Sequence, residues 1–127
     1  MSQPIEDELR AAGVELRAGK SGKIRAARLA AGMALERPQW RQLASLPDLV
    51  RLEAAGAEVR DEHAALLAEL PRLAQLDLSN TSIGDQSLEH LSRCQSLQLL
   101  NLSGVDVTPE AIKQLRQRLL GCRIVRL

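Results

Sequence analysis

Hydrophobic residues recur along most of this 127-residue chain at an interval of 24 positions. The clearest copy of the pattern is LAQLDLSNTSI, residues 73–83, in which three leucines precede a polar turn and one more aliphatic residue. The aligned columns are Leu49, Leu73 and Leu97; Leu52, Leu76 and Leu100; Ala54, Leu78 and Leu102; Val59, Ile83 and Val107; and Leu67, Leu91 and Leu115. A fixed interval of this length indicates stacked copies of one structural unit.

Within each unit the hydrophobic period changes. Leu76 and Leu78 alternate with polar neighbours, which predicts a strand with one buried face. Leu88 and Leu91, after the turn, follow helical spacing. Each unit is therefore strand, turn and helix, and successive strands must be parallel because a helix returns the chain to the same edge.

Two helix starts have recognisable signals. Asp85 is expected to cap the helix that contains Leu88. Thr108, Pro109 and Glu110 form the sequence expected of an N-cap, a first helical position and an acidic first turn.

The repeat weakens toward both ends, as expected for terminal units that face water. Gly32 lies 24 positions before Gly56, but Arg28 occupies the position that matches Leu52. The first strand is therefore expected to be displaced by one residue or otherwise atypical. Ile124 continues the Leu100 column and predicts a short closing strand.

The first 23 residues do not follow the repeat. Pro4 and the acids after it predict a helix that ends near Gly13, followed by an extended segment and a GKSGK turn at residues 19–23. This turn is not a phosphate-binding loop, because Val14 stands where that motif needs its first glycine. We expect one domain, with an N-terminal helical cap and turn at 1–23 and repeats at 24–127.

The segment LAQLDLSNTSIGDQSLEHLSRCQS resembles the 24-residue class of leucine-rich repeats, of the ribonuclease-inhibitor-like and bacterial type. The resemblance covers residues 24–127 and implies a short right-handed α/β solenoid of about four repeats, the last one truncated. Its parallel sheet would line the concave side and its helices the convex side. The column that usually carries Asn or Thr holds Ala57, Thr81 and Val105. A continuous side-chain ladder is therefore not expected, and these turns must satisfy their backbone groups in other ways.

The hydrophobic share is 45%, yet the chain has no Phe or Tyr, and Trp40 is its only aromatic residue. A core of aliphatic residues suits thin layers of equal volume. Trp40 shares its column with Ala64, Leu88 and Ile112, which places it on the inner side of the first repeat's helix. The alternative is a Trp partly exposed beside the cap, where it would anchor a partner.

The net charge is +1, so no overall field favours nucleic acid or a membrane as a partner. Two basic clusters lack intervening acids: Arg17, Lys20, Lys23, Arg25 and Arg28, and Lys113, Arg116, Arg118, Arg123 and Arg126. We interpret them as solvated faces and chain ends, because the aromatic residues that commonly stack on single strands are absent. Whether the clusters at 17–28 and 113–126 have a function stays open.

The first ten residues, MSQPIEDELR, contain acids where a signal peptide carries basic residues, and no long apolar run follows. Two cysteines without a signal peptide are typical of reduced thiols. We therefore expect a cytoplasmic protein.

No cofactor, metal or catalytic residue is predicted. Cys94 and Cys122 are expected to be buried structural thiols, and neither has metal-ligand spacing to a second Cys or His. His90 precedes Cys94 by four positions, so an enzyme with a Cys–His nucleophile is an alternative of another class. His63 and His90 are otherwise expected to be exposed surface residues.

The residues between the leucines should project from the concave face. Adjacent strands place equivalent residues about 4.8 Å apart. The two expected rows are Arg51, Gln75, Leu99 and Arg123, and Glu53, Asp77, Asn101 and Val125. Glu53 and Asp77 become lateral neighbours of like charge, which repel each other. Either Arg51 or Gln75 offsets this repulsion within the chain, or a Lys or Arg of a partner offsets it.

The resemblance implies a non-enzymatic protein–protein interaction module that binds an unidentified partner protein through this concave strand face. The candidate partner-binding residues are Arg51, Glu53, Gln75, Asp77, Leu99 and Asn101. The alternative is a regulatory subunit or inhibitor of an enzyme that uses the same face.

Overall fold

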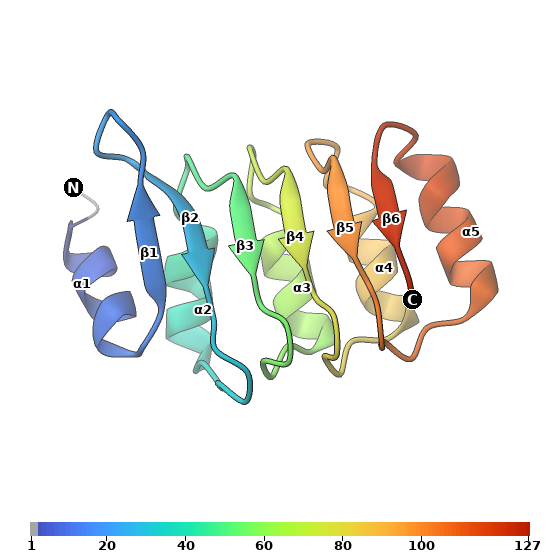
Figure 1. Cartoon of the computed structure of the whole chain (residues 1–127), viewed down its shortest axis with the longest axis horizontal. Coiled ribbons are helices and arrows are strands. Elements are labelled where there is room, and N and C mark those ends of the chain that lie inside the picture. The colour runs from blue at the N-terminus through green and yellow to red at the C-terminus, as the bar shows by residue number, and fades with distance from the viewer. Residues whose placement is uncertain (1–2) are drawn as a thin grey trace.

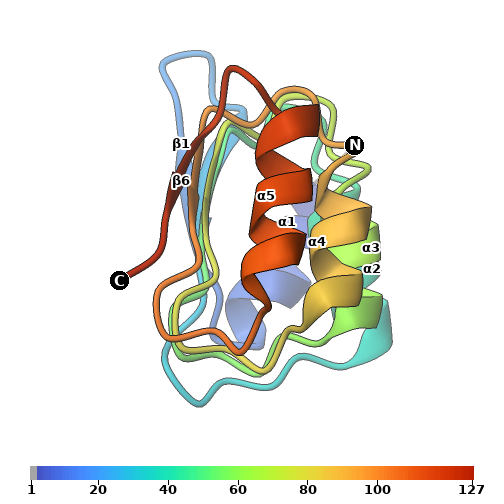
Figure 2. The ribbon, with the colours of Figure 1, turned by 90° about the vertical axis from the view of Figure 1, so that its right-hand side faces the viewer.

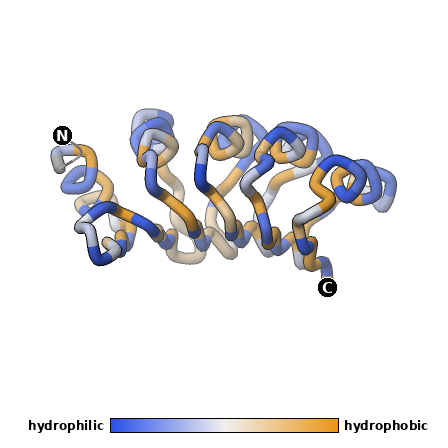
Figure 3. The backbone as a smooth tube through the Cα atoms, turned by 90° about the horizontal axis from the view of Figure 1, so that it is seen from above, coloured by the Kyte–Doolittle hydropathy of each residue, from blue (hydrophilic) through white to orange (hydrophobic). Residues whose placement is uncertain are grey.

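A computed structural model describes residues 3–127, which form one sheet covered on one side by helices (Figure 1). The helices are α1 (Gln3–Ala11), α2 (Arg37–Ala44), α3 (Asp61–Leu67), α4 (Asp85–Leu91) and α5 (Pro109–Arg118). The strands are β1 (Glu15–Ala18), β2 (Ile24–Arg28), β3 (Arg51–Glu53), β4 (Gln75–Asp77), β5 (Leu99–Asn101) and β6 (Arg123–Val125). The end view shows the two layers separately, and from above they follow a shallow arc (Figures 2 and 3).

The sheet has six strands in sequence order, so the chain advances by one strand with each turn of the solenoid. Strands β2 to β6 are parallel, and β1 joins β2 as an antiparallel hairpin. This arrangement confirms the α/β solenoid predicted from the repeat.

The strand register follows the hydrophobic columns. Leu52 pairs with Leu76, Leu76 with Leu100, and Leu100 with Ile124. The partner of Leu52 in β2 is Ala27, so the first strand is displaced by one residue, as Arg28 led us to expect. The displacement buries Ala27 and leaves Arg28 exposed on the open face of the sheet.

The core between sheet and helices is almost wholly aliphatic. Leu52 and Leu100 are fully buried, and Leu76 is 2% exposed. Trp40 is also fully buried on the inner side of α2, which confirms the core interpretation and excludes an exposed anchor.

Backbone hydrogen bonds join the turns that follow the strands. Gly32, Gly56, Asn80 and Gly104 all have positive φ and lie 24 residues apart. The Gly32 N–H donates to Gly56, the Gly56 N–H to Ser79 and the Asn80 N–H to Ser103, at 2.8–2.9 Å. Gly104 is held to glycine by space as well as by φ, because an added Cβ would lie 2.1 Å from Asn80 Oδ1.

The column of Ala57, Thr81 and Val105 forms no side-chain ladder among the described residues. Hydrogen bonds within each repeat close its turns instead. The Ala57 N–H donates to the Ala54 carbonyl at 3.1 Å, and the Val105 N–H to the Leu102 carbonyl at 3.3 Å. The Thr81 hydroxyl donates to the Leu78 carbonyl at 2.7 Å. The backbone groups of these turns are therefore hydrogen-bonded within their own repeat, as the missing ladder required.

The two predicted helix starts have different outcomes. Thr108 Oγ1 accepts the Ala111 N–H at 3.1 Å, which confirms it as the N-cap of α5. The prediction for Asp85 is wrong, because Gly84 is the N-cap of α4. The Asp85 carboxylate instead accepts the N–H and the hydroxyl of Thr108 in the next repeat, both at 2.9 Å.

Asp61, 24 positions before Asp85, forms the same kind of bridge. Its Oδ1 accepts the N–H groups of Gly84 and Ser87 at 3.1 Å and also the Ser87 hydroxyl. The Ser87 hydroxyl contributes most to lowering the pKa of Asp61 below its usual value of 3.8. Asp61 and Asp85 thus tie the helical layer together from one repeat to the next.

Replacing Leu76 or Leu100 with Ala should lower the free energy of unfolding by about 2–5 kcal/mol, because each leaves a cavity between two layers. Urea denaturation followed by circular dichroism measures this loss. Gln98→Ala, at an exposed neighbouring position, should change stability little. A cost near zero at Leu76 would contradict the register.

Replacing Asp61 with Asn should cost about 1 kcal/mol at neutral pH, because a neutral side chain is a weaker acceptor for Gly84 and Ser87. The folded pKa of Asp61 is lowered, so its stabilisation is present above the unfolded value and is lost as pH falls through the folded pKa. Unfolding measured between neutral pH and about pH 3 should show a shallower acid loss in D61N than in wild type. The exposed Asp106→Asn is the control. Identical acid profiles for D61N and wild type would refute the bridge.

Candidate interaction surface on the sheet

The open face of the sheet carries the two expected rows of side chains. Strand pairing places Arg51, Gln75, Leu99 and Arg123 in one row, and Glu53, Asp77, Asn101 and Val125 in the other. All six candidate partner-binding residues line one shallow hollow of about 320 Å³, with Leu52 and Leu76 at its base. That they bind a partner stays a prediction.

Several of these side chains are held in place by bonds within the chain. Arg51 Nε donates to Gln75 Oε1 at 2.9 Å. Asp77 Oδ1 accepts the Ser79 N–H at 3.0 Å and the Ser79 hydroxyl at 2.7 Å. The Asn101 side-chain oxygen accepts the Ser103 N–H at 3.0 Å. This part of the surface is therefore ordered by the chain itself.

Glu53 differs from its neighbours in this respect. Within residues 3–127 its carboxylate forms no hydrogen bond or ion pair, because Arg51 bonds Gln75 instead. Asp77, the lateral neighbour of Glu53, has its own partner in Ser79 but no cation. Within residues 3–127 the two acids therefore stand side by side with no cation bonded to either, although Arg28 of β2 is the lateral neighbour of Glu53 on its other side.

The candidate surface extends farther toward the N-terminus than the sequence indicated. A second hollow of about 190 Å³ adjoins the first, and Arg51 and Glu53 line both. Arg28 and Glu15 also line it and form an exposed ion pair at 3.9 Å. Sequence reasoning missed them because β2 is displaced by one residue and β1 lies outside the repeat.

The cysteines do not have the features of a nucleophilic site. Cys94 is 2% exposed, and burial raises the pKa of its thiol. Its Sγ lies 3.6 Å from Ser96 Oγ. Cys122 is half-buried, and burial raises the pKa of its thiol too. A reactive cysteine needs a lowered pKa and access, so the geometry does not favour the Cys94–His90 alternative.

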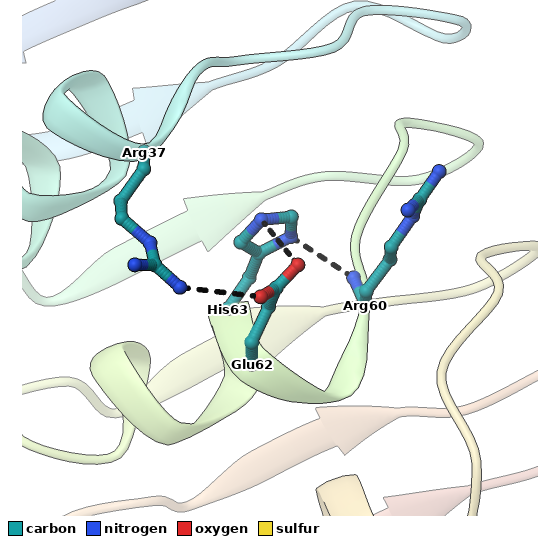
Figure 4. A network of polar contacts seen from close by, with 4 residues as sticks. All are labelled: Arg37, Arg60, Glu62 and His63. Atoms are coloured by element: carbon teal, nitrogen blue, oxygen red, sulfur yellow. Dashed lines mark hydrogen bonds and ion pairs between the residues drawn. The ribbon is translucent and has the colours of Figure 1, made fainter.

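The expectation that His63 is an exposed surface residue is wrong. Its side chain is 15% exposed and stacks on Trp40, with ring centroids 4.5 Å apart and planes 12° from parallel. Nδ1 accepts the Arg60 N–H at 3.0 Å at the start of α3. Glu62 bridges His63 and Arg37 at 3.8 and 3.6 Å (Figure 4). Burial is the main reason that the pKa of His63 lies below 6.5.

Residues 3–127 contain no cluster of three or more His, Cys, Asp or Glu placed to hold a metal ion. No helix among these residues has the length and apolar character needed to span a membrane.

The repeat, the sheet register and the layered core define a leucine-rich-repeat protein, and comparison with known families agrees. Residues 30–126 match the family model described as "FBD-associated F-box protein At5g56370, LRR repeats", so the chain belongs to this leucine-rich-repeat family. Membership supports a general role in protein interaction, and such repeats are typically non-enzymatic scaffolds. A search of curated proteins found no match.

Solved structures with some likeness include the crystal structure of PEPR1–AtPEP1, 15% identical with a TM-score of 0.48. That match covers 87% of this chain and 19% of the other. Another is the Leptospira interrogans LRR protein LIC12759, 20% identical with a TM-score of 0.45, covering 72% of this chain and 28% of that one. This chain spans less than a third of either protein.

Acidification from pH 7 to pH 5 should destabilise the protein through His63. Protonated Nδ1 cannot accept the Arg60 N–H, and the folded pKa lies below the unfolded value of 6.5. The unfolded state therefore binds the proton first, so stability falls as pH drops below about 6.5 toward the folded pKa. Urea unfolding followed by the fluorescence of Trp40 should show this slope in wild type and a smaller one in His63→Gln. Gln98→Ala, at an exposed position that does not titrate, is the control and should keep the wild-type slope.

Proposed function

We propose that this chain is a non-enzymatic interaction module that binds a partner protein through the concave face formed by β2 to β5. The observation that carries the proposal is the hollow of about 320 Å³, in which the unpaired Glu53 carboxylate shares the lining with four side chains held by bonds within the chain: Arg51, Gln75, Asp77 and Asn101. Leu99, at 36% exposure, supplies an apolar contact beside these polar groups.

The charges indicate what the partner presents. A Lys or Arg placed between Glu53 and Asp77 would neutralise both acids and remove their repulsion. Arg51 already bonds Gln75 through Nε, which leaves the rest of its guanidinium to bind a carboxylate. An apolar side chain on the β5 side of these two contacts would cover Leu99. The expected ligand is thus a mixed-charge surface with a central basic residue.

The face is narrow, because strands β2 to β5 span only three intervals of about 4.8 Å. Binding through so small an area depends on a few central contacts rather than on total buried surface. The Glu53–Asp77 pair is the most central charged feature, so substitutions there should have the largest effect.

A photo-crosslinking residue at Leu99 should capture the partner in cells of the protein's own source, and mass spectrometry would identify it. The same residue at Glu89, on the exposed side of α4, is the matched position and should not capture that protein. Equal capture from both positions would contradict binding at the sheet.

The purified partner then allows a charge test. Glu53→Lys combined with Asp77→Asn should weaken binding at least tenfold by calorimetry. Asn at position 77 can still accept the Ser79 N–H, so the turn is kept. Glu89→Lys, an equal charge change on the helix side, should bind as wild type. Unchanged affinity of the Glu53 and Asp77 double variant would refute binding through the concave face.

A further inference from the structure

The second hollow of the sheet differs in charge from the hollow that carries the proposed function. It has a volume of about 190 Å³ and lies over β1, β2 and β3, at the N-terminal side of the sheet (Figure 1). Its charged lining consists of three arginines and two glutamates: Arg17, Arg28, Arg51, Glu15 and Glu53. The charged residues of this hollow therefore have a net charge of +1, whereas those of the first hollow have a net charge of −1.

One row of side chains across this hollow is basic on both sides. Arg17 of β1 pairs with Ala26 of β2, and Ala26 pairs with Arg51 of β3. The two arginines are thus separated by two strand intervals, about 10 Å, with a side chain that ends at Cβ between them. An anion placed over the Ala26 methyl group would lie between two guanidinium groups, and the hollow provides the room for it.

Both arginines of this row have donor groups that the chain itself does not use. Within residues 3–127 the exposed Arg17 side chain forms no hydrogen bond or ion pair. Arg51 bonds Gln75 through Nε alone, at 2.9 Å. The third arginine, Arg28, lies in the other row and is already paired with Glu15 at 3.9 Å. An anion would therefore meet Arg17 and Arg51 first.

The hairpin between β1 and β2 extends the positive charge beyond the hollow. Residues 16–28 contain five basic side chains and no acidic one. Among the described residues, Lys20, Lys23 and Arg25 are exposed and form no ion pair. Three of the four acids in residues 3–23 belong to α1, which lies in the helical layer behind the sheet (Figure 2). On the open face the hairpin thus attracts anions toward the hollow.

We propose that this hollow binds the carboxylate of an aspartate or glutamate side chain of the partner protein, which Arg17 and Arg51 hold above Ala26. The inference rests on the proposed function, because it assigns a second contact to the same face. Guanidinium N–H groups donate well to carboxylate oxygens. The partner would then present an acidic residue over β2 and a basic residue between Glu53 and Asp77.

Two features favour a protein carboxylate over the phosphates of a nucleic acid. Glu15 and Glu53 also line the hollow, so its net charge matches a single negative charge rather than a row of phosphates. The open face has no aromatic side chain on which a base could stack, because Trp40, the only Trp of a chain without Phe or Tyr, is buried behind the sheet.

A carboxylate built into the chain tests the hollow without the partner. Ala26→Glu places a carboxylate between Arg17 and Arg51, and Ala26→Gln is the neutral control of the same size. The Glu variant should unfold at a higher urea concentration than the Gln variant at about 20 mM salt, and the difference should shrink at about 0.5 M salt because salt screens exposed charges. Arg17→Gln or Arg51→Gln should each reduce the difference.

Two results of this comparison would overturn the proposal. Equal urea midpoints for the Glu and Gln variants would mean that the hollow does not favour a carboxylate. A difference that survives both arginine substitutions would assign the effect to other charges, such as Arg28.

The partner captured at Leu99 allows the direct test by calorimetry. Arg17→Gln should weaken binding about threefold to fivefold, as expected for a partly exposed charge pair. Ala26→Glu should bind more weakly than Ala26→Gln, because its own carboxylate fills the hollow and repels that of the partner. Arg41→Gln, on the exposed side of α2, is the matched control and should bind as wild type.

The outcomes separate this inference from the proposed function. If Glu53→Lys with Asp77→Asn weakens binding but Arg17→Gln does not, the concave face is correct and the carboxylate site is wrong. If neither variant weakens binding, the partner binds elsewhere and both are wrong. A labelled single-stranded oligonucleotide that binds wild type and loses its affinity in Arg17→Gln would assign the hollow to nucleic acid instead.

Discussion

Each layer of this molecule is too thin to bury its own leucines, and contact between neighbouring layers is the interaction on which the rest depends. Leu52, Leu76 and Leu100 pack in register across adjacent strands. The turns add backbone bonds between residues about 24 positions apart, and Asp61 and Asp85 add bridges in the helical layer. Stability in such a solenoid is therefore shared between nearest neighbours.

Equal layer thickness also explains where the single large side chain lies. Trp40 shares its column with Ala64 in the next repeat, so a large residue meets a small one across the layer boundary. His63, beside Ala64 in sequence, stacks on the indole ring and covers it. The volume of Trp40 is thus accommodated locally, and the aliphatic packing of the later repeats is unaffected.

The sequence was most informative where a feature repeats. The hydrophobic columns predicted the strands, their parallel order, the buried Trp40 and the displacement of β2, because each follows from burial with a fixed period. The same alternation identified the six residues of the sheet hollow. The polar bridges were missed, because they depend on side-chain geometry between repeats. Asp61 and Asp85 are 24 positions apart, and this spacing would have indicated their shared role. The burial of His63 was not predicted, because the ring that covers it belongs to a neighbour in another repeat.

The left-handed turn residues Gly32, Gly56, Asn80 and Gly104 have a consequence for how such a chain changes length. Their bonds connect one unit only to the next, so an insertion or deletion of 24 residues would leave the remaining units with partners of the same kind. Each added unit would widen the sheet by about 4.8 Å. An insertion of any other length has to be absorbed in a turn between elements, as the one-residue displacement between β2 and β3 already is. Whole units are therefore expected to be gained or lost more readily than fractions of a unit.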